Sequence, residues 1–126
     1  MKSLLIVGLG GSLGAISRYL INIFMLKVIG TSFPWSTLLV NILGSFLMGA
    51  LFEVLSQKIS FSYELKLLLM VGFLGSFTTF STFSMDAVSL FEQGENLSSF
   101  IYIFLSVLLS ITSLILAMHI MKSFVL

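Results

Sequence analysis

Long runs of apolar residues dominate this chain, and short polar stretches separate them. A helix needs about 20 apolar residues to cross the hydrocarbon core of a bilayer. Four runs are near or above this length, at residues 3–26, 35–52, 67–85 and 97–121. The pattern therefore predicts an all-α membrane protein in which four transmembrane helices form one domain of residues 1–126.

The polar stretches between the runs are too short to form a soluble domain. They read KVIGTSFP, EVLSQKISFSYELK and DAVSLFEQGEN. Four crossings place both termini on one side of the membrane. Most lysines lie on that side, with Lys2, Lys58, Lys66 and Lys122 against Lys27 on the other. The positive-inside rule therefore favours cytoplasmic termini.

Composition supports lipid as the main solvent of the chain. Hydrophobic residues make up 58% of it and charged residues only 9%, whereas a soluble domain carries roughly a quarter charged residues. The chain has no cysteine, which excludes a disulfide framework and thiol chemistry. The net charge of +1 indicates no nucleic-acid partner.

Small residues recur four positions apart in the first three runs. This spacing lets helix backbones approach one another closely. The pairs are Gly10 and Gly14, Gly11 and Ala15, Ser45 and Gly49, and Gly72 and Ser76. Because four helices are few to enclose a polar path, we expect an oligomer.

Polar side chains interrupt the second and fourth runs. Thr37, Asn41 and Ser45 form one stripe at helical spacing. An unpaired amide in hydrocarbon costs several kcal/mol, so Asn41 must have a partner, either in a bond that only joins helices or in a site. The fourth run carries a matching stripe of Tyr102, Ser106, Ser110 and Ser113.

Arg18 is the one charge well inside a run. Such a charge usually faces the protein interior or water, in a functional or anchoring role. Arg18 is also close enough to the end of its run, at Leu26, to extend to the membrane interface. No carboxylate is embedded in the runs, because Glu53 and Glu64 lie at or beyond their ends.

The stretch GFLGSFTTFSTFS, residues 72–84, combines hydroxyl side chains with regularly spaced phenyl rings. Its glycines and its successive β-branched or hydroxyl residues make a continuous helix a poor fit. Non-helical backbone at membrane depth is tolerated only where it is buried in protein or lines a wet cavity. We therefore expect a break within residues 75–79 that forms a site.

The chemistry of this stretch suits small ions. Carbonyl groups freed by a broken helix can coordinate a small cation. The neutral hydroxyl donors and the electropositive edges of the phenyl rings suit an anion, and neutral donors release an anion more readily than a buried lysine would. The residues alone predict an anion-friendly polar track without naming the anion.

Three motifs resemble the CrcB/Fluc fluoride channels of bacteria, and the resemblance covers nearly the whole chain. They are GGSLGAISRY, TLLVNILGSFLMG and GFLGSFTTFSTFS, in that order. The resemblance implies a fluoride-specific channel of the bacterial plasma membrane, which exports fluoride from the cytoplasm to relieve its toxicity. It also implies an antiparallel, dual-topology homodimer with two pores and a structural sodium ion, not transported, at its centre.

The resemblance assigns roles to residues of this chain. It implies a pore lined by Asn41, Phe80 and Phe83, and by a fourth-helix serine that aligns best with Ser113, although Ser110 shares its face. Thr37 and Thr79 are further candidates for the pore. The sodium ligands are the backbone carbonyls of Gly75 and Thr78, and Arg18 matches a first-helix arginine taken as structural.

The chain departs from the family pattern at three points. Many relatives have two glycines where this chain has Gly75 and Ser76, and several have a histidine at the position of Leu109. The lysine bias is also stronger than an evenly inserting protein needs. The last departure bears on dual topology and not on the channel assignment.

Other functional classes fit less well. A small multidrug exporter also has four spans. Such exporters have a glutamate within the first helix for proton coupling, whereas the only charge within the first run here is Arg18. A structural subunit would explain the small residues but not the polar stripes. An enzyme is not expected, because the single histidine, His119, has no nucleophile or metal-ligand pattern around it.

Overall fold

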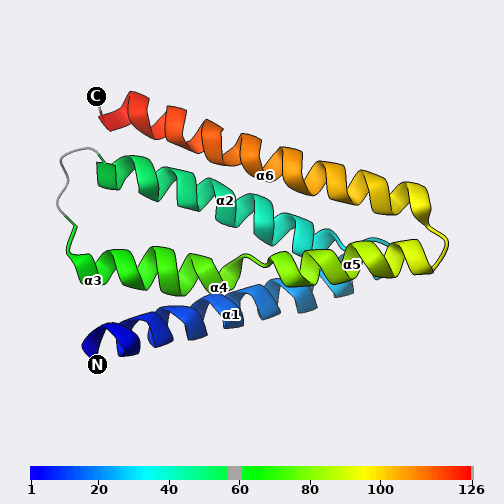
Figure 1. The fold of residues 1–126 in the computed structure, drawn as a ribbon, viewed down its shortest axis with the longest axis horizontal. Coiled ribbons are helices and arrows are strands. Elements are labelled where there is room, and N and C mark those ends of the chain that lie inside the picture. The colour runs from blue at the N-terminus through cyan, green and yellow to red at the C-terminus, as the bar shows by residue number, and fades with distance from the viewer. Residues whose placement is uncertain (57–60, 126) are drawn as a thin grey trace.

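The computed structural model describes residues 1–56 and 61–125, and Figure 1 shows them as long helical segments lying side by side. The first two are α1 (Lys2–Val28) and α2 (Trp35–Ser56). The third consists of α3 (Tyr63–Lys66), the π-helical η1 (Leu67–Leu74), α4 (Gly75–Phe77) and α5 (Phe80–Glu92), and the last is α6 (Asn96–Val125). In the described part of the chain, 4 helical segments are long and apolar enough to cross a membrane. The predicted all-α fold with a broken third helix is confirmed.

Both termini lie at the same end of the bundle, on the left in Figure 1. At that end an ion pair of 3.3 Å between Lys2 Nζ and Glu64 Oε1 joins the start of α1 to α3. The connections from α1 to α2 and from α5 to α6 lie at the opposite end, together with Lys27. Lys58 lies outside the described residues. Which end faces the cytoplasm stays a prediction.

Glycines allow two pairs of helices to pack closely. On α1, a Cβ atom at Gly14 would overlap the carbonyl oxygen of Phe73 in η1. On α2, a Cβ atom at Gly49 would overlap the carbonyl oxygen of Leu114 in α6. Because both obstacles are backbone atoms within helices, neither contact could relax by a side-chain movement. The small residues at these two positions therefore bring helices of one protomer together.

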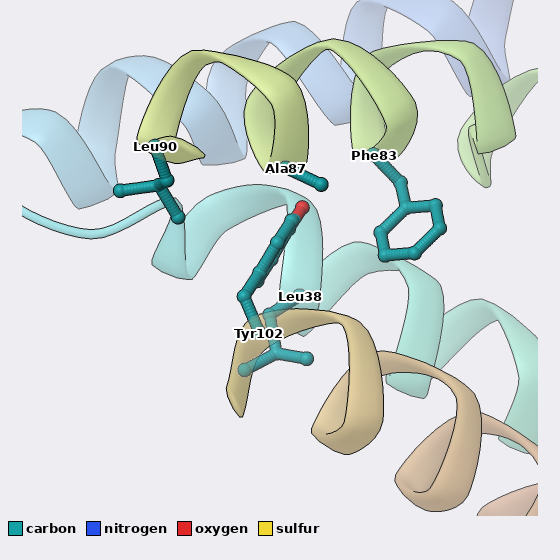
Figure 2. Packing of buried hydrophobic residues seen from close by; sticks show 5 residues of the cluster. All are labelled: Leu38, Phe83, Ala87, Leu90 and Tyr102. Atoms are coloured by element: carbon teal, nitrogen blue, oxygen red, sulfur yellow. The ribbon is translucent and has the colours of Figure 1, made fainter. Parts of the chain in front are cut away.

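Two apolar clusters flank the interruption of the third helix. One joins α2, α5 and α6 and is drawn in Figure 2; its buried members are Leu38, Phe83, Ala87, Leu90 and Tyr102. The other joins α2 to the segment before the interruption, and its buried members are Val40, Leu74 and Phe77. Since each half of the third helix is anchored in its own cluster, the residues between the halves are held in place.

The third helical segment continues beyond the predicted end at residue 85 and includes Asp86. The hydropathy pattern stops at Met85 because a charge follows it. The structure accommodates this charge by a hydrogen bond of 3.1 Å, in which the hydroxyl of Tyr102 donates to Asp86 Oδ2. The helix extends past the predicted span, and the absence of a carboxylate embedded in the membrane stays a prediction.

Candidate functional site

The break in the third helix is a two-residue segment of extended backbone. Thr78 has φ −80° and ψ 157°, and Thr79 has φ −152° and ψ 119°. Thr79 also caps α5, because its Oγ1 accepts a hydrogen bond of 3.2 Å from the backbone N–H of Thr82. The predicted break thus lies within the expected residues, and a threonine begins the helix after it.

Asn41 of α2 binds both backbone groups of Thr79. Its Oδ1 accepts from the Thr79 N–H at 2.8 Å, and its Nδ2 donates to the Thr79 carbonyl oxygen at 3.0 Å. An amide nitrogen carries two hydrogens, so one remains for another acceptor. Asn41 was expected either to join helices or to belong to a site. The structure shows that it joins α2 to the break, and one N–H of its amide stays available for a site.

These bonds free two backbone carbonyl groups. In a continuous α-helix, the N–H of Thr79 would donate to the carbonyl of Gly75, four residues earlier. By the same rule, the N–H of Thr82 would donate to the carbonyl of Thr78. Here the first donates to Asn41 and the second to the Thr79 hydroxyl. The two carbonyls predicted to bind sodium are thus among those that the break leaves without a helical donor.

A groove of about 360 Å³ lies beside the break, between α2, α5 and α6. Five of the predicted pore residues line it: Asn41, Thr79, Phe80, Phe83 and Ser110. The rings of the two phenylalanines are close, with centroids 5.4 Å apart. Phe83 is 9% exposed and belongs to the core, whereas Phe80 is 78% exposed on the surface of the protomer. The groove therefore has one packed wall and one wall that a single chain leaves uncovered.

The two candidate serines of α6 lie differently. Ser110 lines the groove. The hydroxyl of Ser113 lies 3.0 Å from the carbonyl oxygen of Ile42 in α2 and 2.9 Å from that of Ser110, and it is the donor to both. Ser113 therefore braces α6 against α2.

Ser106 is a groove residue that was absent from the predicted site. It lines the groove, is 6% exposed, and its buried Oγ has no hydrogen-bond partner within the described residues. A serine in a helix commonly bonds back to the carbonyl four residues earlier. The polar stripe on α6 contains Ser106, so the sequence pattern indicates this residue, whereas the family resemblance indicates Ser110 and Ser113.

A polar cleft lies on the other side of the break, between α1, α2 and α5. It consists of two adjoining cavities of about 200 Å³ each, which share Asn22, Ser36, Thr37 and Thr82. Arg18 lines one cavity and Asp86 the other. Thr37 belongs to this cleft and does not line the groove, although it shares a helical stripe with Asn41.

Arg18 is half-buried in the cleft, and it forms no hydrogen bond or ion pair with any residue that the structure describes. Its guanidinium, with five N–H donors, is therefore open to an anion in the cleft. Thr79 lines both the cleft and the groove. The cleft and the groove thus adjoin at the break. The cleft contains the cationic group of Arg18, and the groove contains neutral donors.

The chain is similar in sequence to a known protein family and to several named proteins. A family model described as CrcB-like protein, Camphor Resistance (CrcB), matches residues 5–118. A Rhizobium etli protein named fluoride-specific ion channel FluC is 46% identical over 125 residues, covering 99% of this chain and 100% of that protein. A Rhizobium meliloti protein of the same name is 44% identical over 125 residues, with the same coverage. One from Shewanella sp. strain ANA-3 is 57% identical over 95 residues, which are 75% of this chain and 76% of that protein.

Proposed function

Because this chain belongs to the CrcB-like family, whose matched relatives are named fluoride-specific ion channels, we propose that it conducts fluoride across a bacterial plasma membrane. It is a multi-pass membrane protein. The observation that carries the proposal is the groove at the break, where amide and hydroxyl donors lie beside the rings of Phe80 and Phe83. Neutral donors and positive ring edges can replace part of the hydration shell of a small anion.

The proposed anion path runs through both the cleft and the groove. Arg18 raises the local concentration of anions in the cleft. Beyond Thr79, the groove offers no cationic side chain among its lining residues, so the anion is bound weakly enough to leave. Chloride is larger than fluoride and loses its water more easily, so selectivity for fluoride must come from a narrow path lined by donors and not from dehydration or net charge.

A second copy of the chain completes each groove. A polar groove facing lipid would leave hydrogen-bonding groups unsatisfied, at several kcal/mol each, and Phe80 is 78% exposed in the protomer. A homodimer covers both grooves and so forms two pores. The channel then releases fluoride from the cytoplasm, down its gradient, and relieves fluoride toxicity.

Charge supports an antiparallel arrangement of the two copies. The terminal end of the protomer carries more basic than acidic described residues, and the opposite end the reverse. The first set is Lys2, Lys66 and Lys122 with Glu53 and Glu64, and the second is Lys27 with Asp86, Glu92 and Glu95. Antiparallel protomers place these unlike ends side by side, whereas parallel protomers would place like ends together.

A sodium ion at the dimer axis fits the freed carbonyls. Unwound helices in membrane proteins hold sodium through backbone oxygens, and the carbonyls of Gly75 and Thr78 have lost their helical partners. Gly75 is exposed on the protomer surface, where a partner can approach it. Two carbonyls from each copy would supply the ligands, and the ion would offset the repulsion between their dipoles.

Flux measurements on proteoliposomes test the proposal. Purified protein should release trapped fluoride, read with a fluoride electrode, while trapped chloride stays inside. Protein-free liposomes provide the control. Chloride release at the same rate would contradict fluoride selectivity.

The same vesicles separate a channel from a coupled exporter. The carboxylate of Asp86 inside α5 makes this comparison necessary, because exporters of similar size use an embedded carboxylate for proton coupling. A channel releases fluoride at equal pH on both sides, once a potassium ionophore balances charge. Release that requires a pH gradient would favour the exporter.

A further inference from the structure

Two residues at the boundary between the cavities of the cleft are bonded to each other. The cavity that contains Arg18 and the cavity that contains Asp86 have lining residues in common, and Asn22 and Ser36 are two of these. The hydroxyl of Ser36, in the first turn of α2, donates to Asn22 Oδ1 of α1 at 2.8 Å. A hydrogen bond between two helices therefore lies where one cavity meets the other.

This bond determines which polar atoms of the pair stay available. A serine hydroxyl has one hydrogen, and Ser36 donates it to Asn22. An amide has an acceptor oxygen and two N–H donors, and the oxygen of Asn22 is the atom that accepts from Ser36. Among the described residues, Asn22 makes no other hydrogen bond. Its two N–H donors are therefore left for an acceptor in the cleft.

The charged groups of the cleft lie on either side of the boundary. Asp86 lines the cavity next to the connection between α1 and α2, and Arg18 lines the cavity that reaches Thr79. An anion that moves toward the break therefore leaves a carboxylate and approaches a guanidinium. Fluoride holds its water strongly, so it needs donors that replace this water along the way. At the boundary, the amide of Asn22 supplies them.

We propose that Asn22 is a further anion-binding residue of the path and that Ser36 is the positioning residue that orients its amide. This inference rests on the proposed fluoride conduction. A hydrogen bond from an amide to an anion is stronger than one to a neutral acceptor. The amide is uncharged, so an anion bound there can still move on to Arg18, one helical turn away on α1.

Two substitutions of Asn22 test the inference in the full-length protein. Asn22→Leu has a similar size and removes every polar atom, whereas Asn22→Asp keeps an acceptor for Ser36 and removes both donors. Fluoride release from proteoliposomes at neutral pH should fall by about tenfold or more in both variants, as expected for the loss of a hydrogen bond to an ion. Gel filtration and the unfolding temperature in detergent show whether each variant is folded.

Ser12→Ala is the matched control. Ser12 is also on α1, where its hydroxyl donates to the carbonyl oxygen of Gly8 at 2.8 Å, and it lines neither the cleft nor the groove. Its replacement should leave fluoride release unchanged.

The two Asn22 variants together separate anion binding from other roles. If only Asn22→Asp lowers fluoride release, the added negative charge explains the loss and the inference is wrong. If only Asn22→Leu lowers it, Asn22 merely joins α1 to α2, and the inference is also wrong. Wild-type release in both variants would contradict it as well. Absence of fluoride release from the wild type would instead contradict the proposed function.

A second pair of variants applies if the Asn22 variants do not yield folded protein. Ser36→Ala removes the hydroxyl that orients the amide and should lower fluoride release. Ser36→Thr keeps a hydroxyl and should retain release near that of the wild type. If Ser36→Ala releases fluoride as fast as the wild type, Ser36 does not position Asn22 and the inference is wrong.

Discussion

Single residues decide how the broken helix survives in an apolar environment. The break exposes backbone groups that water cannot reach, and Asn41 satisfies both groups of Thr79 with one side chain. Thr79 in turn satisfies the N–H of Thr82. Because both bonds divert donors from earlier carbonyls, the same two residues that stabilise the break also create the candidate cation site.

Replacing Asn41 tests this account. Asn41→Ala would leave the N–H and the carbonyl of Thr79 without partners, at about 1–3 kcal/mol for each buried group. We therefore expect a lower unfolding temperature in detergent and a loss of fluoride flux. Asn22→Ala is the matched control for stability alone, since among the described residues Asn22 makes one hydrogen bond, accepted from Ser36 at 2.8 Å. Equal stability of the two variants would show that Asn41 does not support the break.

Variants of Phe80 and Phe83 can distinguish a role in conduction from a role in packing. Phe80 is exposed in the protomer and Phe83 is part of the core. Phe80→Ile keeps apolar bulk but removes the positive ring edge, so flux should fall severely while the protomer keeps its stability. Phe83→Ile should lower both flux and stability, the latter by about 1 kcal/mol or more. Wild-type flux in both variants would reduce the two rings to ordinary packing.

At the level of helices, the lengths of the apolar runs were sufficient to predict four helices long enough to cross a membrane. The glycine and threonine content of residues 72–84 predicted the break, because these residues have low helix propensity. The partner of Asn41 could not be predicted, because Thr79 is 38 residues away along the chain. Thr37 and Asn41 share a stripe on α2 but line different cavities, since the break divides the space along that stripe. The length of α5 beyond residue 85 could not be predicted, because hydropathy ends an apolar run at a charge whereas the helix continues through Asp86.

Close helix packing gives a prediction of its own. Gly14→Ala would place a methyl group on the carbonyl oxygen of Phe73 and should destabilise the contact between α1 and η1 by about 1–3 kcal/mol. Gly8→Ala is the control on the same helix, because a Cβ there meets nothing within 4 Å. It should be neutral or slightly stabilising, since alanine favours helix. Thermal unfolding in detergent compares the two, and equal effects would show that α1 does not pack on η1 at Gly14.

For the whole molecule, the protomer has the features of one half of an assembly. Its groove has an uncovered wall at Phe80, and Gly75, which carries one of the freed carbonyls, is exposed. A helical bundle of this size has little core of its own, so its completed sites depend on a second copy. The proposed sodium ion would lie where the two copies meet, and it should therefore control assembly and flux together.

Sodium removal is the test at this scale. Freed carbonyl dipoles repel one another, and a small hard cation offsets that repulsion, so replacing sodium with N-methylglucamine on both sides should slow fluoride flux and loosen the dimer. Thr78→Ser should have little effect, because the ligand is a backbone oxygen. Gly75→Val should reduce flux or dimerisation, since a branched side chain would stand at the exposed approach to the carbonyl. No sodium gradient is needed, which distinguishes a structural ion from a transported one. If flux and dimer content are unchanged after exhaustive sodium removal, the cation site is wrong, and water or side chains must satisfy the carbonyls of Gly75 and Thr78 instead.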